Sequence, residues 1–352
     1  MTANDLVPMA DAIPVDWRWL YFLLILTFVL HLLFMNVMLG SAVIAFAGDL
    51  RKKDAGPSKD ISTKLPYTIA FTVNLGVAPL LFLQVLYGQF IYVSSVLMAG
   101  YWLSVIGLLI ILYYSAYIYD FRFDRMPGAR TFFIGLTVIL GLGVAFLFTN
   151  NMTLMIRPET WKEYVANRSG TLLNLGDPTL WPRYLHFVVA SLAVGGLFQA
   201  VSAKLRSALP NRTQRIDQGM RWFAWATVGQ IMIGIWFLIS LPRNVMLSFM
   251  GAAGLNTAVF IAGLTGAVLS LVFGFTRRVW AAAASTLGTV VLMVLVRDLV
   301  RTQFLQPYFH PTDLKLIPQY GPMIVFFVAL VLGLVLVAFM LNMAANAKRR
   351  AE

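Results

Sequence analysis

Nine long apolar segments, separated by short charged connections, dominate this 352-residue sequence. A helix that crosses the hydrocarbon core of a bilayer needs about 20 apolar residues. The segments that qualify are residues 17–46, 66–95, 99–120, 130–156, 182–203, 221–241, 253–275, 279–297 and 321–344. Because lipid offers backbone polar groups no partner, each segment is predicted to be a helix. The sequence therefore predicts an all-α integral membrane protein with about nine transmembrane helices, in a single domain over residues 1–352.

The composition narrows the chemistry that such a protein can carry. Only 12% of the residues are charged, against about 25% in soluble domains, and the net charge of +12 comes from clusters between apolar runs. Nucleic acid is therefore excluded as a partner. Cysteine is absent, which excludes iron–sulfur clusters and covalently attached c-type haem. The acidic N-terminus and the long first apolar run predict no cleavable signal peptide.

The distribution of lysine and arginine predicts the orientation of the chain. Successive connections must lie on opposite sides of the membrane. With the span ends near them, the connections on one side hold nine of the 27 basic residues, and those on the other side hold eighteen. The side richer in Lys and Arg is predicted to be cytoplasmic. With an odd number of spans, this places the N-terminus outside and the C-terminus in the cytoplasm. The two longest connections, 157–181 and 298–320, then lie outside, and a bacterial inner membrane is the expected location.

Two of the three histidines lie inside predicted spans, where ionisable residues are costly and usually functional. His31 lies in the first span, where the alternatives are a haem ligand and a histidine bonded to a neighbouring helix. His186 lies one turn into the fifth span, with Arg183 three residues earlier on the same helix face. An imidazole can bind haem iron while a guanidinium meets a propionate. The alternative for Arg183 is a cation at the membrane boundary.

The end of the eighth span carries a further charged pair. Asp298 and Arg301 are spaced i, i+3 in LVRDLVRTQF, which is consistent either with a functional pair or with an exposed interfacial salt bridge. His310 precedes a proline in a predicted loop and is expected at the surface. Two iron-competent histidines on different helices favour a haem protein over a channel or a transporter.

Five stretches of the chain together resemble one protein family. They are LHLLFMNVMLG around His31, LGVAPLLFLQVLYGQF at 75–90, FTNNMTLMIRP at 148–158, RYLHFVVAS around His186, and Asp298-Leu-Val-Arg301. In their order and spacing they resemble subunit I of cytochrome bd quinol oxidase, over roughly residues 17–345. The resemblance implies two four-helix bundles plus a ninth helix, with non-covalent haem toward the outer face.

The resemblance also implies roles for particular residues. His31 would ligate the haem of the oxygen site, and His186 a low-spin haem b. Asp298 stands where the family has a glutamate that serves the high-spin haem b, and Arg301 would meet propionates. Aspartate is one methylene shorter than glutamate, which weighs against direct ligation of iron by Asp298. One to three haems b are implied, with a quinone as a further candidate cofactor.

The sequence also departs from the family. Ile106 and Tyr114 stand where the family has two glutamates of its proton path. Residues 242–254 are too short for the family's charged quinol-binding loop. The expected methionine ligand opposite His186 is absent from the seventh span, and Met246 and Met250 are the nearest substitutes. The chain therefore resembles a divergent, shortened relative that lacks the quinol loop.

Three functions remain open on the sequence. The first is a haem b subunit that passes electrons between a quinone pool and an outer-face partner such as a cytochrome c, together with other membrane subunits. The second is a terminal oxidase subunit that reduces oxygen at a haem ligated by His31. The third is a transporter or assembly protein without redox activity, in which His31 and His186 are packed side chains.

Overall fold

The computed structural model describes residues 4–51 and 55–351, and this part of the chain is helical. Within these residues nine helices are long and apolar enough to cross a membrane, which confirms the predicted all-α class and the number of spans. They are α1 (Trp17–Leu50), α3 (Leu65–Leu97), α4 (Ala99–Phe121), α5 (Arg130–Met155), α6 (Leu180–Leu205), α7 (Arg212–Ser240), α9 (Gly254–Phe275), α10 (Val279–Leu305) and α11 (Tyr320–Ala351).

Shorter helices lie in the connections between the spans. They are η1 (Asn4–Leu6), α2 (Ala55–Ser62), η2 (Pro158–Val165), α8 (Arg243–Leu247), the π-helical η3 (Ser248–Ala252) and η4 (Pro311–Asp313). Among the described residues the only β interaction is an isolated parallel bridge between Ile13 and Leu316. It joins the N-terminal segment to the segment before α11, so these two regions lie at the same end of the molecule, as the predicted topology requires.

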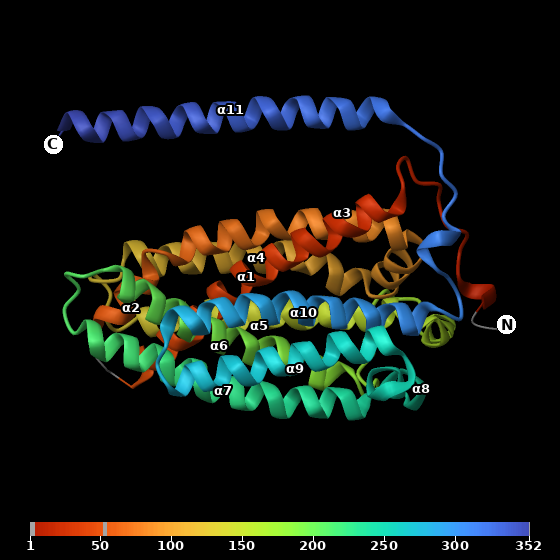
Figure 1. The fold of residues 1–352 in the computed structure, drawn as a ribbon, viewed down its shortest axis with the longest axis horizontal. Coiled ribbons are helices and arrows are strands. Elements are labelled where there is room, and N and C mark those ends of the chain that lie inside the picture. The colour runs from red at the N-terminus through yellow and green to blue at the C-terminus, as the bar shows by residue number, and fades with distance from the viewer. Residues whose placement is uncertain (1–3, 52–54, 352) are drawn as a thin grey trace.

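The described spans pack in two groups of four, and the ninth, α11, lies beside them (Figure 1). Helices α1, α3, α4 and α5 pack together, as do α6, α7, α9 and α10, and α1 packs along α6 to join the groups. Helix α11 runs apart from both groups, and its apolar stretch is exposed along its whole length. This arrangement is the one that the resemblance implied.

Small residues allow the close contact between α1 and α6. A Cβ atom built on Gly40 would lie 1.7 Å from the carbonyl oxygen of Ser191, and one on Gly195 would lie 2.5 Å from the carbonyl carbon of Gly40. No larger side chain fits there without separating the helices. Such contacts are typical of membrane helices, because small residues let two backbones approach and pack closely.

Helix α3 is irregular where it passes the interior of the molecule. Pro79 lies inside the helix, where its ring nitrogen cannot donate the usual hydrogen bond. Tyr87 departs from helical geometry, with φ −134° and ψ 33°. Non-helical backbone within a membrane is tolerated where protein surrounds it, and Tyr87 is fully buried.

Helix α10 differs from its prediction. The predicted span ended at residue 297, whereas α10 continues to Leu305. The three charged residues at 297, 298 and 301 lower the hydropathy of this stretch, yet the helix continues because these side chains lie inside the protein rather than in lipid. The last two turns of α10 therefore belong to the interior of the molecule.

Candidate cofactor site

A buried ion pair lies near the C-terminal end of α10, which is its predicted outer end. Arg301 pairs with Asp298, and the hydroxyl of Tyr21 on α1 donates to the same carboxylate. Asp298 is 2% exposed and Arg301 6% exposed, which excludes the alternative of an exposed interfacial salt bridge. A charge pair in an apolar interior is costly to desolvate, so its presence there indicates a specific role more than a gain in stability.

Arg301 has more donors than the structure satisfies. Its guanidinium carbon lies 4.3 Å from the ring centroid of Tyr87, and its Nε is buried without a hydrogen-bond partner. The hydroxyl of Tyr87 is also buried and unpartnered. Buried polar groups are nearly always hydrogen-bonded, so these orphaned atoms indicate a missing partner.

His31 is held in a fixed orientation between α1 and α3. Its Nδ1 lies 3.0 Å from the backbone oxygen of Thr72, which can only accept, so Nδ1 carries the proton in this contact. The ring lies against Gly76, where a built Cβ would be 2.9 Å from the Cε1 and Nδ1 atoms of His31. This is the bond to a neighbouring helix that the sequence analysis left open as the alternative to a haem ligand. It leaves the lone pair of Nε2 free, and metal-ligating histidines are oriented in the same way, so the bond is consistent with both interpretations.

His186 and Arg183 are also buried with unused polar atoms. The Nδ1 of His186 and the Nε and Nη2 of Arg183 have no hydrogen-bond partner. Gly234 on α7 lies beside the imidazole, and its built Cβ would be 3.3 Å from Cε1 of His186. Arg183 lies over the ring of Phe237, with 5.2 Å from the guanidinium carbon to the centroid. Arg183 is therefore buried in the protein, and the alternative of a cation that extends to the membrane boundary is wrong.

Arg297 is a member of this site that the sequence analysis missed. Its guanidinium carbon lies 4.3 Å from the ring centroid of Phe28 on α1, and its charge acts on His31. The positive charges of Arg301 and Arg183 both repel that of Arg297. The spacing i, i+4 between Arg297 and Arg301 places both on one helix face, and this was the signal available in the sequence.

The cluster is short of negative charge. Arg183, Arg297 and Arg301 face one another with Asp298 as the carboxylate that pairs directly within the group, which leaves a surplus of two positive charges. Unpaired charges are very costly in a low-dielectric interior. The donors that remain free fit one further dianionic group.

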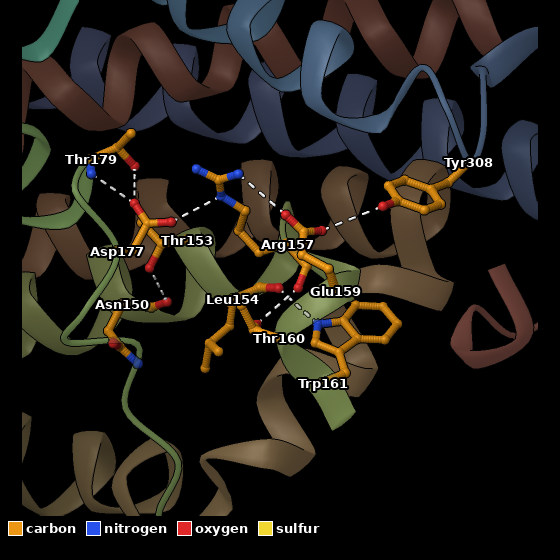
Figure 2. A network of polar contacts seen from close by, with 10 residues as sticks. All are labelled: Asn150, Thr153, Leu154, Arg157, Glu159, Thr160, Trp161, Asp177, Thr179 and Tyr308. Carbon is orange, nitrogen blue, oxygen red and sulfur yellow. Dashed lines mark hydrogen bonds and ion pairs between the residues drawn. The ribbon is translucent and has the colours of Figure 1, made fainter. Parts of the chain in front are cut away.

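A polar network in the connection between α5 and α6 explains why Arg183 has no acid of its own (Figure 2). Asp177, the carboxylate whose charge acts on Arg183, accepts from Nε of Arg157 at 2.9 Å and from the backbone nitrogen of Thr179 at 2.7 Å. Arg157 also bonds Glu159, which in turn accepts from Tyr308. These contacts fix the connection between α5 and α6 and occupy both oxygens of Asp177.

The donors of this site fit haem rather than a bare metal ion. Within residues 4–51 and 55–351 no three His, Asp or Glu side chains gather as a metal site. Haem needs only one or two axial ligands from the protein, since its own ring supplies the other nitrogens. The free Nε2 of His31, the unpartnered His186 and the unsatisfied guanidinium groups match iron ligands and propionate partners, respectively.

Other residues singled out in the sequence lie outside this cluster. Ile106 and Tyr114 are 63% and 69% exposed on the outside of α4. Met250 is 60% exposed, so it is not placed as a buried ligand, while Met246 is half-buried against the core. His310 is exposed and caps η4, which confirms its prediction as a surface residue.

Comparisons of the chain with models of protein families, with curated proteins and with solved structures give no match.

Proposed function

We propose that this protein is a haem b-binding membrane subunit of a respiratory electron-transfer complex, a divergent and shortened relative of subunit I of cytochrome bd oxidases. The observation that carries the proposal is the surplus of two buried positive charges on Arg183, Arg297 and Arg301, with unsatisfied Nε atoms on Arg183 and Arg301. One haem b carries two propionates. Its carboxylates supply the charge and the acceptors that the cluster lacks.

Each residue of the cluster has a role in this proposal. His31, with its proton on Nδ1 held by Thr72, would offer Nε2 to a haem iron, and His186 would offer an imidazole nitrogen to the iron of a haem b. The three arginines would bind propionates. Asp298 neutralises part of the charge of Arg301 and fixes the orientation of its guanidinium group, while Tyr21 holds the carboxylate of Asp298 in place. A bound haem supplies a reversible one-electron couple, whose potential the surrounding charges tune.

Two observations favour electron transfer over oxygen reduction. Both oxygens of Asp298 are engaged, one with Arg301 and one with Tyr21, so its carboxylate is not free to ligate iron. Ile106 and Tyr114 are turned outward on α4, and neither provides a carboxylate for proton transfer to the interior. The site lies toward the predicted outer face. We therefore expect a redox partner there, such as a cytochrome c, with a quinone as the other reactant, in a bacterial inner membrane.

The exposed ninth helix supports an assembly with other membrane subunits. The apolar stretch of α11 is fully exposed in the single chain, and Phe326, Val331 and Leu334 are examples of its large exposed side chains. Lipid or a neighbouring subunit would cover this helix in the membrane. We expect the second case for at least part of its surface, because none of this apolar stretch is buried against the rest of the chain.

A terminal oxidase is the second candidate function, and the geometry of His31 favours it. With Nδ1 bonded to Thr72 and Nε2 free, His31 could hold the haem at which oxygen would be reduced. Oxygen consumption separates the two functions. Rapid consumption with a quinol or a reduced cytochrome c supports the oxidase, and its absence together with haem reduction by the same donor supports electron transfer.

The test of haem binding uses the three histidines as a matched set. His186→Ala should remove one haem b and leave the protein inserted in the membrane, and His31→Ala should remove the haem that it ligates. His310→Ala is the control, because this exposed side chain caps a surface turn. Full haem content in both span variants would contradict the assignment. An absence of haem from all of them and from the unaltered protein would favour the transporter or assembly protein.

A further inference from the structure

A small hollow lies at the predicted cytoplasmic end of the molecule, where α2 meets the end of α6 and the start of α7. Its lining includes Asp60, Lys64, Phe198, Ser202, Arg206 and Arg215. Its volume is about 30 Å³, enough for one or two water molecules but not for a haem or a quinone ring. The hollow is therefore distinct from the cofactor site in both position and size.

Charged side chains from α2, the start of α3, the end of α6 and the start of α7 converge on this hollow. Asp60 on α2 accepts from Nη1 of Arg206 at 3.0 Å and also pairs with Arg215 on α7. Lys64 donates from Nζ to the hydroxyl of Ser202 at 2.8 Å, and its ammonium lies 5.6 Å from the ring centroid of Phe198. Asp60 thus shares one negative charge between two guanidinium groups, while Lys64 has a neutral partner.

The cluster is short of acceptors as well as of negative charge. Among the described residues, Asp60 is the carboxylate that pairs with Arg206 and Arg215. The Nε of Arg215 and the Nε2 of Gln199, which also lines the hollow, are buried without a hydrogen-bond partner. Burial and the charges of Arg206 and Arg215 lower the pKa of Lys64. The charges and free donors around this hollow therefore favour binding of a further anion.

A role in topology alone does not explain this arrangement. Basic residues that only orient a membrane protein can remain in solvent, as Arg221 does on the same helix as Arg215. The side chain of Arg215 is instead only 17% exposed, and Lys64 is held over an aromatic ring between α3 and α6. Partly burying three cations around one carboxylate is unfavourable unless a further acid completes the group.

We infer that this hollow binds a phosphate-bearing anion, with the headgroup of an anionic phospholipid of the adjacent leaflet as the expected source. The site lies at the end of α6 and the start of α7, a position expected at headgroup level. Leu205, next to Arg206 in the chain, is 68% exposed and offers an apolar contact to an acyl chain. Basic pockets between transmembrane helices on the cytoplasmic side are suited to such headgroups. The oxygens of a phosphate at the mouth of the hollow would accept from Lys64, Arg206 and Arg215. This inference does not depend on the proposed function.

The experiment measures phospholipid binding to the purified, delipidated full chain in detergent. Native mass spectrometry counts bound phosphatidylglycerol and phosphatidylcholine, and the thermal midpoint is recorded with each lipid and with inorganic phosphate. Arg215→Gln removes a central donor, and Lys64→Gln is a second variant that keeps a hydrogen bond to Ser202. Arg221→Gln is the control, with the same change of charge on the same helix but outside the hollow.

The unaltered chain and Arg221→Gln should bind phosphatidylglycerol in preference to phosphatidylcholine. Each of the two hollow variants should lose about fivefold in affinity, the effect of roughly 1 kcal/mol per basic residue. Stabilisation by phosphatidylglycerol alone identifies a lipid as the source, and stabilisation by millimolar inorganic phosphate that Arg215→Gln abolishes identifies free phosphate. Equal binding by Arg215→Gln, Lys64→Gln and Arg221→Gln, or no preference for phosphatidylglycerol, would overturn the inference.

Discussion

Replacing Asp298 with asparagine tests the buried ion pair at the end of α10. Asp298 is 2% exposed, Arg301 is 6% exposed, and Tyr21 donates to the same carboxylate. Removing one partner of a buried pair costs about 3–5 kcal/mol, because the other charge is left buried and uncompensated. At about 2 °C per kcal/mol, the lower end for larger domains, the thermal midpoint of Asp298→Asn should fall by about 6–10 °C.

The assay is thermal unfolding in detergent, followed by circular dichroism, on the protein freed of cofactor. Asp217→Asn is the control, because it makes the same change in a more exposed ion pair, 3.0 Å from Arg277, and should cost less than about 1 kcal/mol. The double variant Asp298→Asn/Arg301→Gln should lose less stability than the sum of its single variants, since it leaves no unpaired charge. Equal midpoints for Asp298→Asn and Asp217→Asn would refute the reasoning.

Four further predictions follow from the packing and from the proposed cofactor. Gly40→Val should destabilise the protein by about 1–3 kcal/mol or prevent its assembly, because a Cβ there would overlap Ser191. Gly107→Val is the control, because its side chain would enter open space and should leave the thermal midpoint unchanged. Similar midpoints for the two variants would contradict the close contact of α1 and α6. In the haem-loaded protein, Arg301→Gln should lower the midpoint potential of the haem by roughly tens of millivolts, since losing a nearby positive charge favours oxidised iron. A potentiometric titration that shows no shift would mean that Arg301 does not lie beside the haem. Tyr114→Phe should leave turnover and proton uptake unchanged in sealed vesicles, because this side chain faces outward; loss of proton uptake would promote the oxidase. The protein should purify with other subunits under mild detergent, at least one of which exposes a redox cofactor at the outer face; a preparation of this chain alone that catalyses turnover would contradict this.

The spans could be predicted because a segment that crosses a membrane must be apolar along its length. Lipid selects about 20 apolar residues for each crossing, so hydropathy locates the helices without knowledge of their packing. The same rule failed at the end of α10, where Arg297, Asp298 and Arg301 lower the hydropathy although the helix continues to Leu305. Hydropathy reports what lipid would tolerate, whereas these side chains are surrounded by protein.

The candidate site was predictable only in part, because its members come from different helices. Two histidines and the pair of Asp298 with Arg301 were identified as ionisable residues in or beside apolar runs. Their contacts depend on how the helices pack, so neither Tyr21 nor the glycine at position 76 beside His31 could be assigned. Arg297 was missed because a basic residue at the end of an apolar run is usually a boundary charge.

The surplus of positive charge at the site could not be predicted from the sequence, because it depends on which ion pairs form in the folded chain. In the sequence, Asp177 lies only six residues before Arg183, which makes it a candidate partner for that arginine. In the structure, the carboxylates of Asp177 and Glu159 both pair with Arg157, and Asp177 is also bonded to Thr179 (Figure 2). Because of these pairs, Arg183 has no acidic partner. The spacing of residues in the sequence does not show which of two arginines an aspartate will bind.

The measurement that tests the central claim most directly is the haem content of the purified, unaltered protein. A difference spectrum between the dithionite-reduced and oxidised states, together with extraction of the cofactor, identifies the haem type and its ratio to the chain. We predict the spectrum of a b-type haem, with at least one non-covalent haem b per chain. Protein that is folded, expressed with an adequate haem supply and free of haem would contradict the account.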